Sequence, residues 1–145
     1  MHGQIAIGIT ASLANIAVHA SIMAFLIWTV HRTTRATHMM TLRHRLMLVM
    51  MATVAVLMFA HLMEIGIWGL VYAALDVTKD PTDAYYFAFV NYTTLGYGDV
   101  LPVDYWRLLG PMAAMNGVLL FGWSTAVLFD VLRTLTRAEW SNVET

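Results

Sequence analysis

Hydrophobic residues fall along this chain in three long runs separated by polar connectors. The runs cover roughly residues 5–30, 46–75 and 108–132. A helix needs about 20 apolar residues to cross the roughly 30 Å hydrocarbon core of a bilayer, and each run is longer than that. The pattern predicts an all-α membrane protein with three transmembrane helices, each somewhat tilted.

A shorter apolar segment lies within the second connector. Pro81, Thr82 and Asp83 form a helix-start signal in which Asp or Thr can cap free N–H groups. The helix expected over 83–93 would be about 15 Å long, half the thickness of a membrane. Such a helix must re-enter from one side, and the negative end of its dipole would point inward and favour a cation.

The composition fits a chain whose solvent is partly lipid. Hydrophobic residues make up 59% and charged residues 12%, whereas a soluble domain holds about 25% charged residues. The absence of cysteine excludes disulfides and thiolate metal sites. No basic n-region precedes the first run, so we expect a retained membrane helix rather than a signal peptide. Nothing indicates nucleic-acid binding, and we expect no cofactor.

The charges are divided unequally between the two connectors. The first, residues 31–45, carries arginines and no acidic residue, whereas the second, residues 76–107, is acidic. Arg133 and Arg137 follow the third run. The positive-inside rule therefore places the first connector and the C-terminus in the cytoplasm, and the N-terminus and second connector outside. We expect a multi-pass protein of the cell membrane, plasma or inner.

The most specific chemistry lies in one string of the second connector: Thr93, Thr94, Leu95, Gly96, Tyr97, Gly98 and Asp99. Glycine adopts left-handed backbone angles at little steric cost, so the string suits a strand whose carbonyls all face one axis. It resembles the selectivity filter of the tetrameric potassium channels. In such filters, rings of carbonyl oxygens replace the water shell of K⁺.

The resemblance covers the second and third runs and the connector between them, with pore helix, filter and inner helix over 85–132, and it implies roles for individual residues. The ion ligands would be the carbonyl oxygens and one hydroxyl of the filter, from Thr94, Leu95, Gly96, Tyr97 and Gly98. Tyr97 would point away from the axis and prop the ring open. One filter per chain implies a homotetramer around a central pore, with K⁺ as the permeant ion.

The third run resembles the inner helix of the same family. Gly117 takes the place of a gating hinge, and Gly122 that of a small residue at which inner and outer helices approach. The other residues expected to line the pore or move on opening are Phe121, Thr125 and Phe129.

The chain departs from the family around its filter. Tyr86 and Phe87 replace two tryptophans, Val90 replaces a glutamate used by some bacterial members, and Leu95 stands where valine is commonest. We therefore predict that Tyr86 donates its hydroxyl to Asp99 of the same or a neighbouring subunit. The predicted filter support comprises Thr93, Asp99, Tyr86 and Val90.

The resemblance also divides the chain into segments. The pore module is expected over 46–133, with an outer helix 46–75, a pore helix 83–93, a filter 94–99 and an inner helix 108–132. Residues 1–45 would form an extra helix and a basic connector, and 134–145 a short cytoplasmic tail. The extra helix lacks the regularly spaced arginines of a voltage sensor. We expect it to pack outside the outer helix.

A polar cluster is predicted between the first two runs. His61 and Glu64 lie three residues apart, hence on one helix face, and His19 and Asn15 on the first run are candidate partners. A carboxylate in hydrocarbon is costly, so a pairing or functional role is expected. Hydrogen bonding between the two runs is the simplest role. A proton-sensing pair and a metal site are alternatives, although His61 and Glu64 alone supply fewer ligands than zinc requires.

Histidines accompany the arginines of the first connector. His31, His38 and His44 can titrate near neutral pH, and basic segments attract anionic lipid. We expect a solvated segment that sets the topology. Binding of anionic lipid over 31–45 and gating by pH are further hypotheses.

Together these features favour a potassium-selective channel that conducts passively. A weakly selective cation channel is an alternative. Related non-selective filters lack a residue that matches Tyr97 or Gly98, whereas both are present here. A non-conducting membrane subunit would have no use for the filter string. An intramembrane enzyme built on His61 and Glu64 would need further ligands or a nucleophile, so we expect no enzyme.

Overall fold

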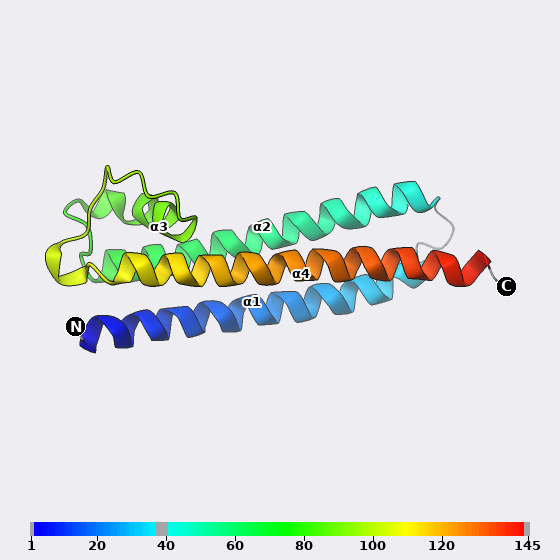
Figure 1. The fold of residues 1–145 in the computed structure, drawn as a ribbon, viewed down its shortest axis with the longest axis horizontal. Coiled ribbons are helices and arrows are strands. Elements are labelled where there is room, and N and C mark those ends of the chain that lie inside the picture. Colours follow the sequence, from blue (N-terminus) through cyan, green and yellow to red (C-terminus); the bar gives the residue numbers. More distant parts are fainter. Residues whose placement is uncertain (1, 37–40, 144–145) are drawn as a thin grey trace.

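Three long helices run side by side, and the short elements gather at one end of them (Figure 1). The computed structural model describes the backbone of residues 2–36 and 41–143, with side chains over 2–32 and 41–137. Helix α1 covers His2–Ala36, α2 covers Leu42–Ala74 and α4 covers Leu109–Val143. All three are long and apolar enough to cross a membrane. The predicted multi-pass helical membrane protein is confirmed.

The helices extend beyond the apolar runs that predicted them. α4 was expected to end near residue 132, but it continues to Val143 through the segment predicted as a tail. α2 begins at Leu42 rather than 46, and α1 continues to Ala36. An apolar run marks only the part of a helix that lies in hydrocarbon, whereas polar helix-forming residues carry the helix into water.

The connector between α2 and α4 contains the short elements η1 (Pro81–Asp83), α3 (Ala84–Tyr92) and η2 (Asp104–Trp106). They lie at the end that also holds the N-terminus, opposite the C-terminal ends of α1 and α4 and the start of α2 (Figure 1). Val103 N donates to Val77 O at 2.8 Å, next to an isolated bridge between Thr78 and Pro102. These contacts tie the two ends of the connector together.

The capping residue of this segment differs from the prediction. Asp80, rather than Thr82 or Asp83, accepts the backbone N–H of Thr82, at 2.9 Å, and also the Thr82 hydroxyl, at 2.8 Å. These two bonds lower the pKa of Asp80. The cap lies earlier because the chain first makes the 3-10 turn η1, with Pro81 at its start, before α3 begins.

Helix α1 packs against both α2 and α4, which corrects the expectation that it lies outside α2. Near the C-terminal end of α1 a buried apolar cluster joins the three helices, formed by Met23, Leu26, Val30, Leu57, Ala60, Val127, Val131 and Leu135. Because lipid tails are as apolar as these side chains, close packing rather than escape from water holds this cluster together.

A second buried cluster fixes α3 against α2 and α4. The ring centroids of Tyr72 and Phe87 lie 5.3 Å apart, and the Tyr72 hydroxyl donates to Leu109 O at 3.2 Å. Gly69 of α2 permits a further close contact, the approach of the Tyr85 ring of α3, because a Cβ there would lie 2.5 Å from that ring. Aromatic packing thus sets where the segment after α3 begins.

Candidate functional site

The chain leaves α3 through a hydrogen-bonded turn. Leu95 N donates to Val90 O at 2.9 Å, and Gly96 N to the same oxygen at 3.4 Å. The Thr93 hydroxyl donates to Phe89 O at 2.7 Å. Val90 and Thr93 therefore contact this turn through hydrogen bonds, and Val90 does so through its main chain. A side-chain pattern cannot reveal that contact.

Every second residue of the segment has a left-handed backbone angle. The φ values are 59° at Thr94, 61° at Gly96 and 77° at Gly98. In a strand with uniform angles successive carbonyls point to opposite sides, whereas alternation of the sign of φ turns them toward one side. The alternation expected from the glycines is therefore present. Thr94 extends it, although a positive φ is strained for a β-branched residue.

The segment has little cover within one chain. All residues from 93 to 99 are exposed, including the large side chains of Leu95 and Tyr97, with exposed fractions of 52% and 69%. A membrane protein does not leave strained, non-helical backbone against lipid unless protein or a water-filled cavity surrounds it. Within the described residues, one chain therefore leaves this strained backbone uncovered.

The predicted hydrogen bond between Tyr86 and Asp99 is confirmed, and it forms within one chain. Tyr86 Oη donates to Asp99 Oδ2 at 2.5 Å, and Val100 N donates to Asp99 Oδ1 at 3.1 Å. The tyrosine bond is the main cause that lowers the pKa of Asp99. It joins the start of α3 to the end of the segment.

Replacing Tyr86 with phenylalanine is expected to raise the pKa of Asp99 toward its ordinary value. A carboxylate with a lowered pKa stays ionised as the pH falls. The variant should therefore lose Asp99-dependent function at a higher pH than the unmodified chain. Ion flux into vesicles as a function of pH measures this shift. Tyr85→Phe is the matched control, because the Tyr85 hydroxyl makes no hydrogen bond within the described residues; identical pH profiles for all three proteins would contradict the role of the Tyr86 bond.

The polar cluster centres on Glu64, whose side chain is fully buried. His19 Nδ1 lies 2.7 Å from Glu64 Oε1, and His61 Nδ1 lies 3.0 Å from Oε2. Tyr92, the last residue of α3, donates its hydroxyl to Oε2. His61 Nε2 lies 3.0 Å from the Ser124 hydroxyl of α4. The carboxylate accepts from groups on α1, α2 and α3, so the cluster joins every long element of the chain.

A neighbouring pair extends the cluster toward α4. Asn15 Nδ2 donates to Asn116 Oδ1 at 2.8 Å and to Glu64 O at 3.3 Å, and Trp68 Nε1 donates to the same Asn116 oxygen at 3.1 Å. The predicted hydrogen bonding of His19, Asn15, His61 and Glu64 is confirmed. It links α1 to α4 as well as to α2.

Four members of this network were not predicted: Tyr92, Ser124, Asn116 and Trp68. The signal that could have found them is general, because any polar side chain within a membrane helix needs a partner. Asn116 and Ser124 are such residues in the third run. Their partners depend on helix packing, which the sequence does not specify.

The same cluster has the composition of a metal site, but the facing atoms of its three candidate ligands are already paired without one. One ligand atom each from His19, His61 and Glu64 lies within 4.8 Å of the others. These atoms are however engaged with one another as donors and acceptors, at 2.7 and 3.0 Å. Zinc, with bonds of about 2.0–2.2 Å to such ligands, would have to displace those protons and separate the groups. The geometry favours the hydrogen-bonded cluster.

The residues expected to govern opening lie along α4. Phe121 packs its ring on His61, with centroids 4.5 Å apart, while Thr125 donates its hydroxyl to Phe121 O at 2.9 Å. Phe129 is 68% exposed. A Cβ on Gly122 would meet nothing within 4 Å, so the approach predicted there is not made within this chain. A Cβ on Gly117 would overlap Tyr92 O.

Replacing Gly117 with alanine is therefore expected to destabilise the protein, because the new methyl group meets a backbone carbonyl that cannot rotate away. Overpacking of this kind costs about 1–3 kcal/mol. A lower thermal unfolding midpoint of the purified protein would measure it. Gly66→Ala is the control, since a Cβ on that α2 glycine meets nothing within 4 Å. An unchanged midpoint for Gly117→Ala would contradict the close approach.

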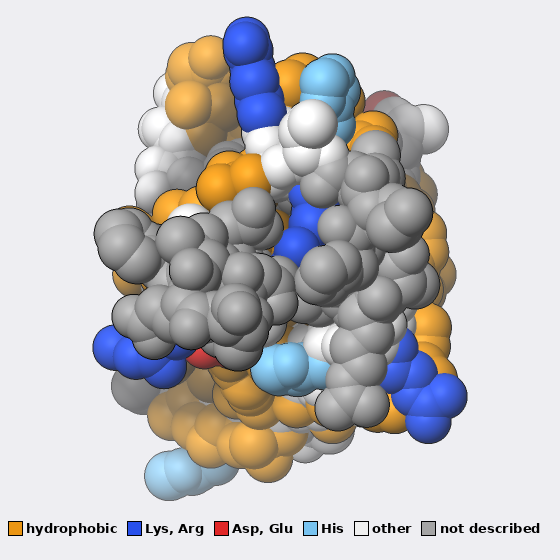
Figure 2. All heavy atoms as spheres, turned by 90° about the vertical axis from the view of Figure 1, so that its right-hand side faces the viewer, with side chains coloured by type: hydrophobic (Ala, Val, Ile, Leu, Met, Phe, Trp, Pro, Cys, Tyr) orange, Lys and Arg blue, Asp and Glu red, His pale blue; other side chains and the backbone are white. Residues whose placement is uncertain are grey.

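Arginine and histidine side chains gather at the opposite end of the molecule, which carries the α1–α2 connection and the end of α4 (Figure 2). The exposed ones are His31, Arg32, Arg43, His44, Arg133 and Arg137. His44 Nδ1 lies 2.6 Å from the Thr41 hydroxyl. His38 lies outside the described residues. The charge asymmetry between the two ends thus follows that of the sequence.

Comparison with known proteins gives one result. A family model described as "Ion channel" matches residues 60–134, which cover the second half of α2, α3, the segment after it and most of α4. No curated protein and no solved structure matches the chain.

Proposed function

Because the chain belongs to the ion channel family built on a two-helix pore module, we propose that it is a potassium-selective channel. K⁺ would pass down its electrochemical gradient through a filter formed by residues 94–98. The alternating positive φ angles at Thr94, Gly96 and Gly98 carry this proposal. Few other protein functions require a strained Thr-Leu-Gly-Tyr-Gly strand in the connector between two membrane helices.

A homotetramer is part of the proposal. One chain supplies one carbonyl strand, and an ion that has lost its water shell needs oxygens on all sides. The exposure of residues 93–99 within one chain supports an assembly in which other copies supply the missing cover. Closed rotational symmetry places four identical strands around one axis.

The proposed path of an ion uses this chain's own groups. K⁺ would shed water against the carbonyls of Thr94, Leu95, Gly96 and Tyr97, and against the Thr94 hydroxyl. Several ions in single file repel one another, which keeps binding from stalling conduction. Helix α3 would act as the pore helix. Its C-terminal end, which carries the negative end of the helix dipole, would face a hydrated ion below the filter.

Glu64 would add to that field. Its carboxylate contacts the hydroxyl of Tyr92, the last residue of α3. Buried charges are screened little, so one acidic group per chain would lower the potential at the inner end of the filter. The buried cluster would thus favour cations as well as hold the helices together.

For orientation, we propose that the end bearing the filter segment faces outward and the basic end faces the cytoplasm. The exposed arginines at the α1–α2 connection and at the end of α4 support this placement through the positive-inside rule. The N-terminus would then lie outside and the C-terminus inside. Gating would involve α4 near Gly117.

Reconstitution into lipid vesicles tests the function. With a K⁺ gradient, we expect a flux that Ba²⁺ blocks and that Na⁺ does not replace. Equal Na⁺ flux would identify a weakly selective cation channel instead. Absence of any flux from correctly assembled protein would identify a non-conducting subunit.

A further inference from the structure

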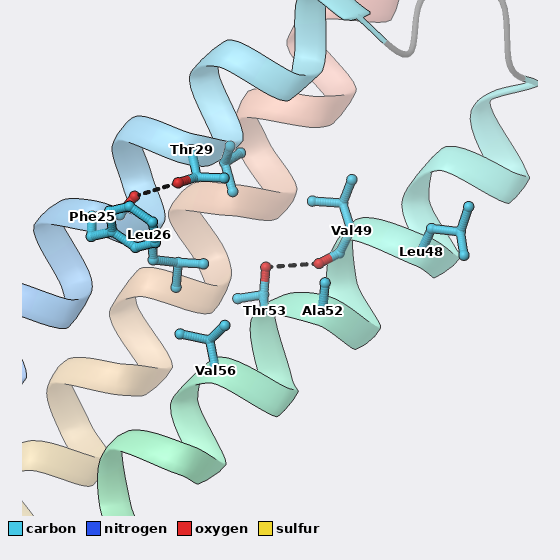
Figure 3. A pocket seen from close by; sticks show the side chains of 9 residues that line it. Phe25, Leu26, Thr29, Leu48, Val49, Ala52, Thr53 and Val56 are labelled. Atoms are coloured by element: carbon cyan, nitrogen blue, oxygen red, sulfur yellow. Dashed lines mark hydrogen bonds between the residues drawn. The ribbon is translucent and has the colours of Figure 1, made fainter.

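A groove runs between α1 and α2 toward the basic end of the molecule (Figure 3). Phe25 and Thr29 of α1 line one side, and Leu48, Ala52 and Val56 of α2 line the other. Its volume is about 470 Å³, within the range of small-ligand pockets. From residue 48 to 56 it extends about 12 Å along α2, as the rise per helical residue gives.

The walls of the groove are apolar in effect, although two threonines belong to them. Thr29 donates its hydroxyl to Phe25 O, and Thr53 donates to Val49 O, both at 2.8 Å, as the dashed lines in Figure 3 mark. Both hydroxyl protons are thus used within their own helices. An occupant of this groove must therefore be apolar.

The surroundings of the groove change sharply at its basic end. The groove lies within the spans His2–Arg32 and Leu42–Ala74, and hence at the level of hydrocarbon. Arg32, which is exposed, follows within two residues of the α1 wall. The Arg32 guanidinium lies 4.4 Å from the centroid of the Trp28 ring, an arrangement typical of a membrane interface.

We propose that this groove binds one acyl chain of an anionic phospholipid, whose phosphate is held by Arg32. The acyl chain would pack against the apolar walls. A guanidinium group can bind two phosphate oxygens at once through parallel N–H donors. Positive charge at the basic end of the groove would select an anionic lipid. Each arginine near the membrane surface contributes roughly a fivefold preference for an anionic headgroup. The inference goes beyond the proposed function and does not depend on ion conduction.

The test measures lipid rather than current. The full chain is reconstituted in vesicles of phosphatidylcholine and phosphatidylglycerol at a 3:1 ratio, extracted in mild detergent, and its bound phospholipid identified by mass spectrometry. We expect phosphatidylglycerol to be enriched over its share in the vesicle.

Two pairs of variants separate the parts of the site. Ala52→Phe fills the groove and should release the bound lipid, whereas Ala55→Phe changes an exposed alanine of the same helix outside the groove and should not. Arg32→Gln should reduce the preference for phosphatidylglycerol by about fivefold. Arg107→Gln, an exposed arginine at the other end of the molecule, should leave it unchanged.

Several results would overturn the proposal. Equal lipid retention by Ala52→Phe and Ala55→Phe would place the bound lipid elsewhere. Retention of the two phospholipids by the unmodified chain in the 3:1 ratio of the vesicle would exclude the arginine headgroup site. If Ala52→Phe instead disrupts the oligomer in light scattering while lipid content stays constant, a second copy of the chain covers the groove. Since none of these measurements uses ion flux, failure here and failure of the channel proposal are distinguishable.

Discussion

Replacing Gly96 with alanine is expected to lower K⁺-selective flux by more than about tenfold without preventing assembly. Gly96 has a φ of 61°, a conformation that costs an L-residue with a Cβ roughly 1–2 kcal/mol. In the proposed tetramer, four copies would repeat that cost around one axis. The strand can relieve this cost only by losing the alternation of φ that turns its carbonyls toward one side. In the proposed filter, those carbonyls would no longer replace the ion's water shell.

Gly66→Ala is the matched control for this experiment. It makes the same chemical change in α2, where a Cβ meets nothing within 4 Å and alanine is the better helix former. Its flux should equal that of the unmodified chain. Vesicle flux of K⁺ and Na⁺, together with light scattering of the purified oligomer, separates loss of selectivity from loss of folding. Undiminished selective flux in Gly96→Ala would place the filter elsewhere.

What the sequence predicts well in this protein depends on single residues or on length. Three spans follow from the length of the apolar runs, and the left-handed angles at Gly96 and Gly98 follow from the absence of a Cβ. The bond from Tyr86 to Asp99 follows from two polar groups on one short connector. In each case the cause lies within the local segment that shows the effect.

What the sequence does not predict depends on which helix faces meet. In lipid, an apolar residue can face either a neighbour or the bilayer, so hydrophobic periodicity does not identify the buried face of α1. Its contact with α4, through Asn15 and Asn116, was missed for that reason. Val90 is among the predicted filter-support residues, but the role of its carbonyl is not predicted, because a backbone acceptor leaves no trace in the residue type.

Replacing Glu64 with glutamine is expected to destabilise the protein by about 3–5 kcal/mol, as the loss of one member of a buried ionic network does. The carboxylate accepts from His19, His61 and Tyr92 at once. An amide has one acceptor oxygen and adds two donors, so it places N–H groups against N–H or O–H groups in a region without water. The thermal unfolding midpoint should fall by about 10 °C or more.

Asp104→Asn is the control, since it also exchanges a carboxylate for an amide. Asp104 Oδ1 lies 3.5 Å from Arg107 Nε, with side chains 94% and 74% exposed, so screening by water reduces the loss to at most about 1 kcal/mol. Tyr92→Phe should fall between the two, because it removes one donor but keeps the charge. If Glu64→Gln and Asp104→Asn unfold at the same temperature, the buried carboxylate does not hold the helices together. In that case the field it supplies at the end of α3 would be the reason for its presence.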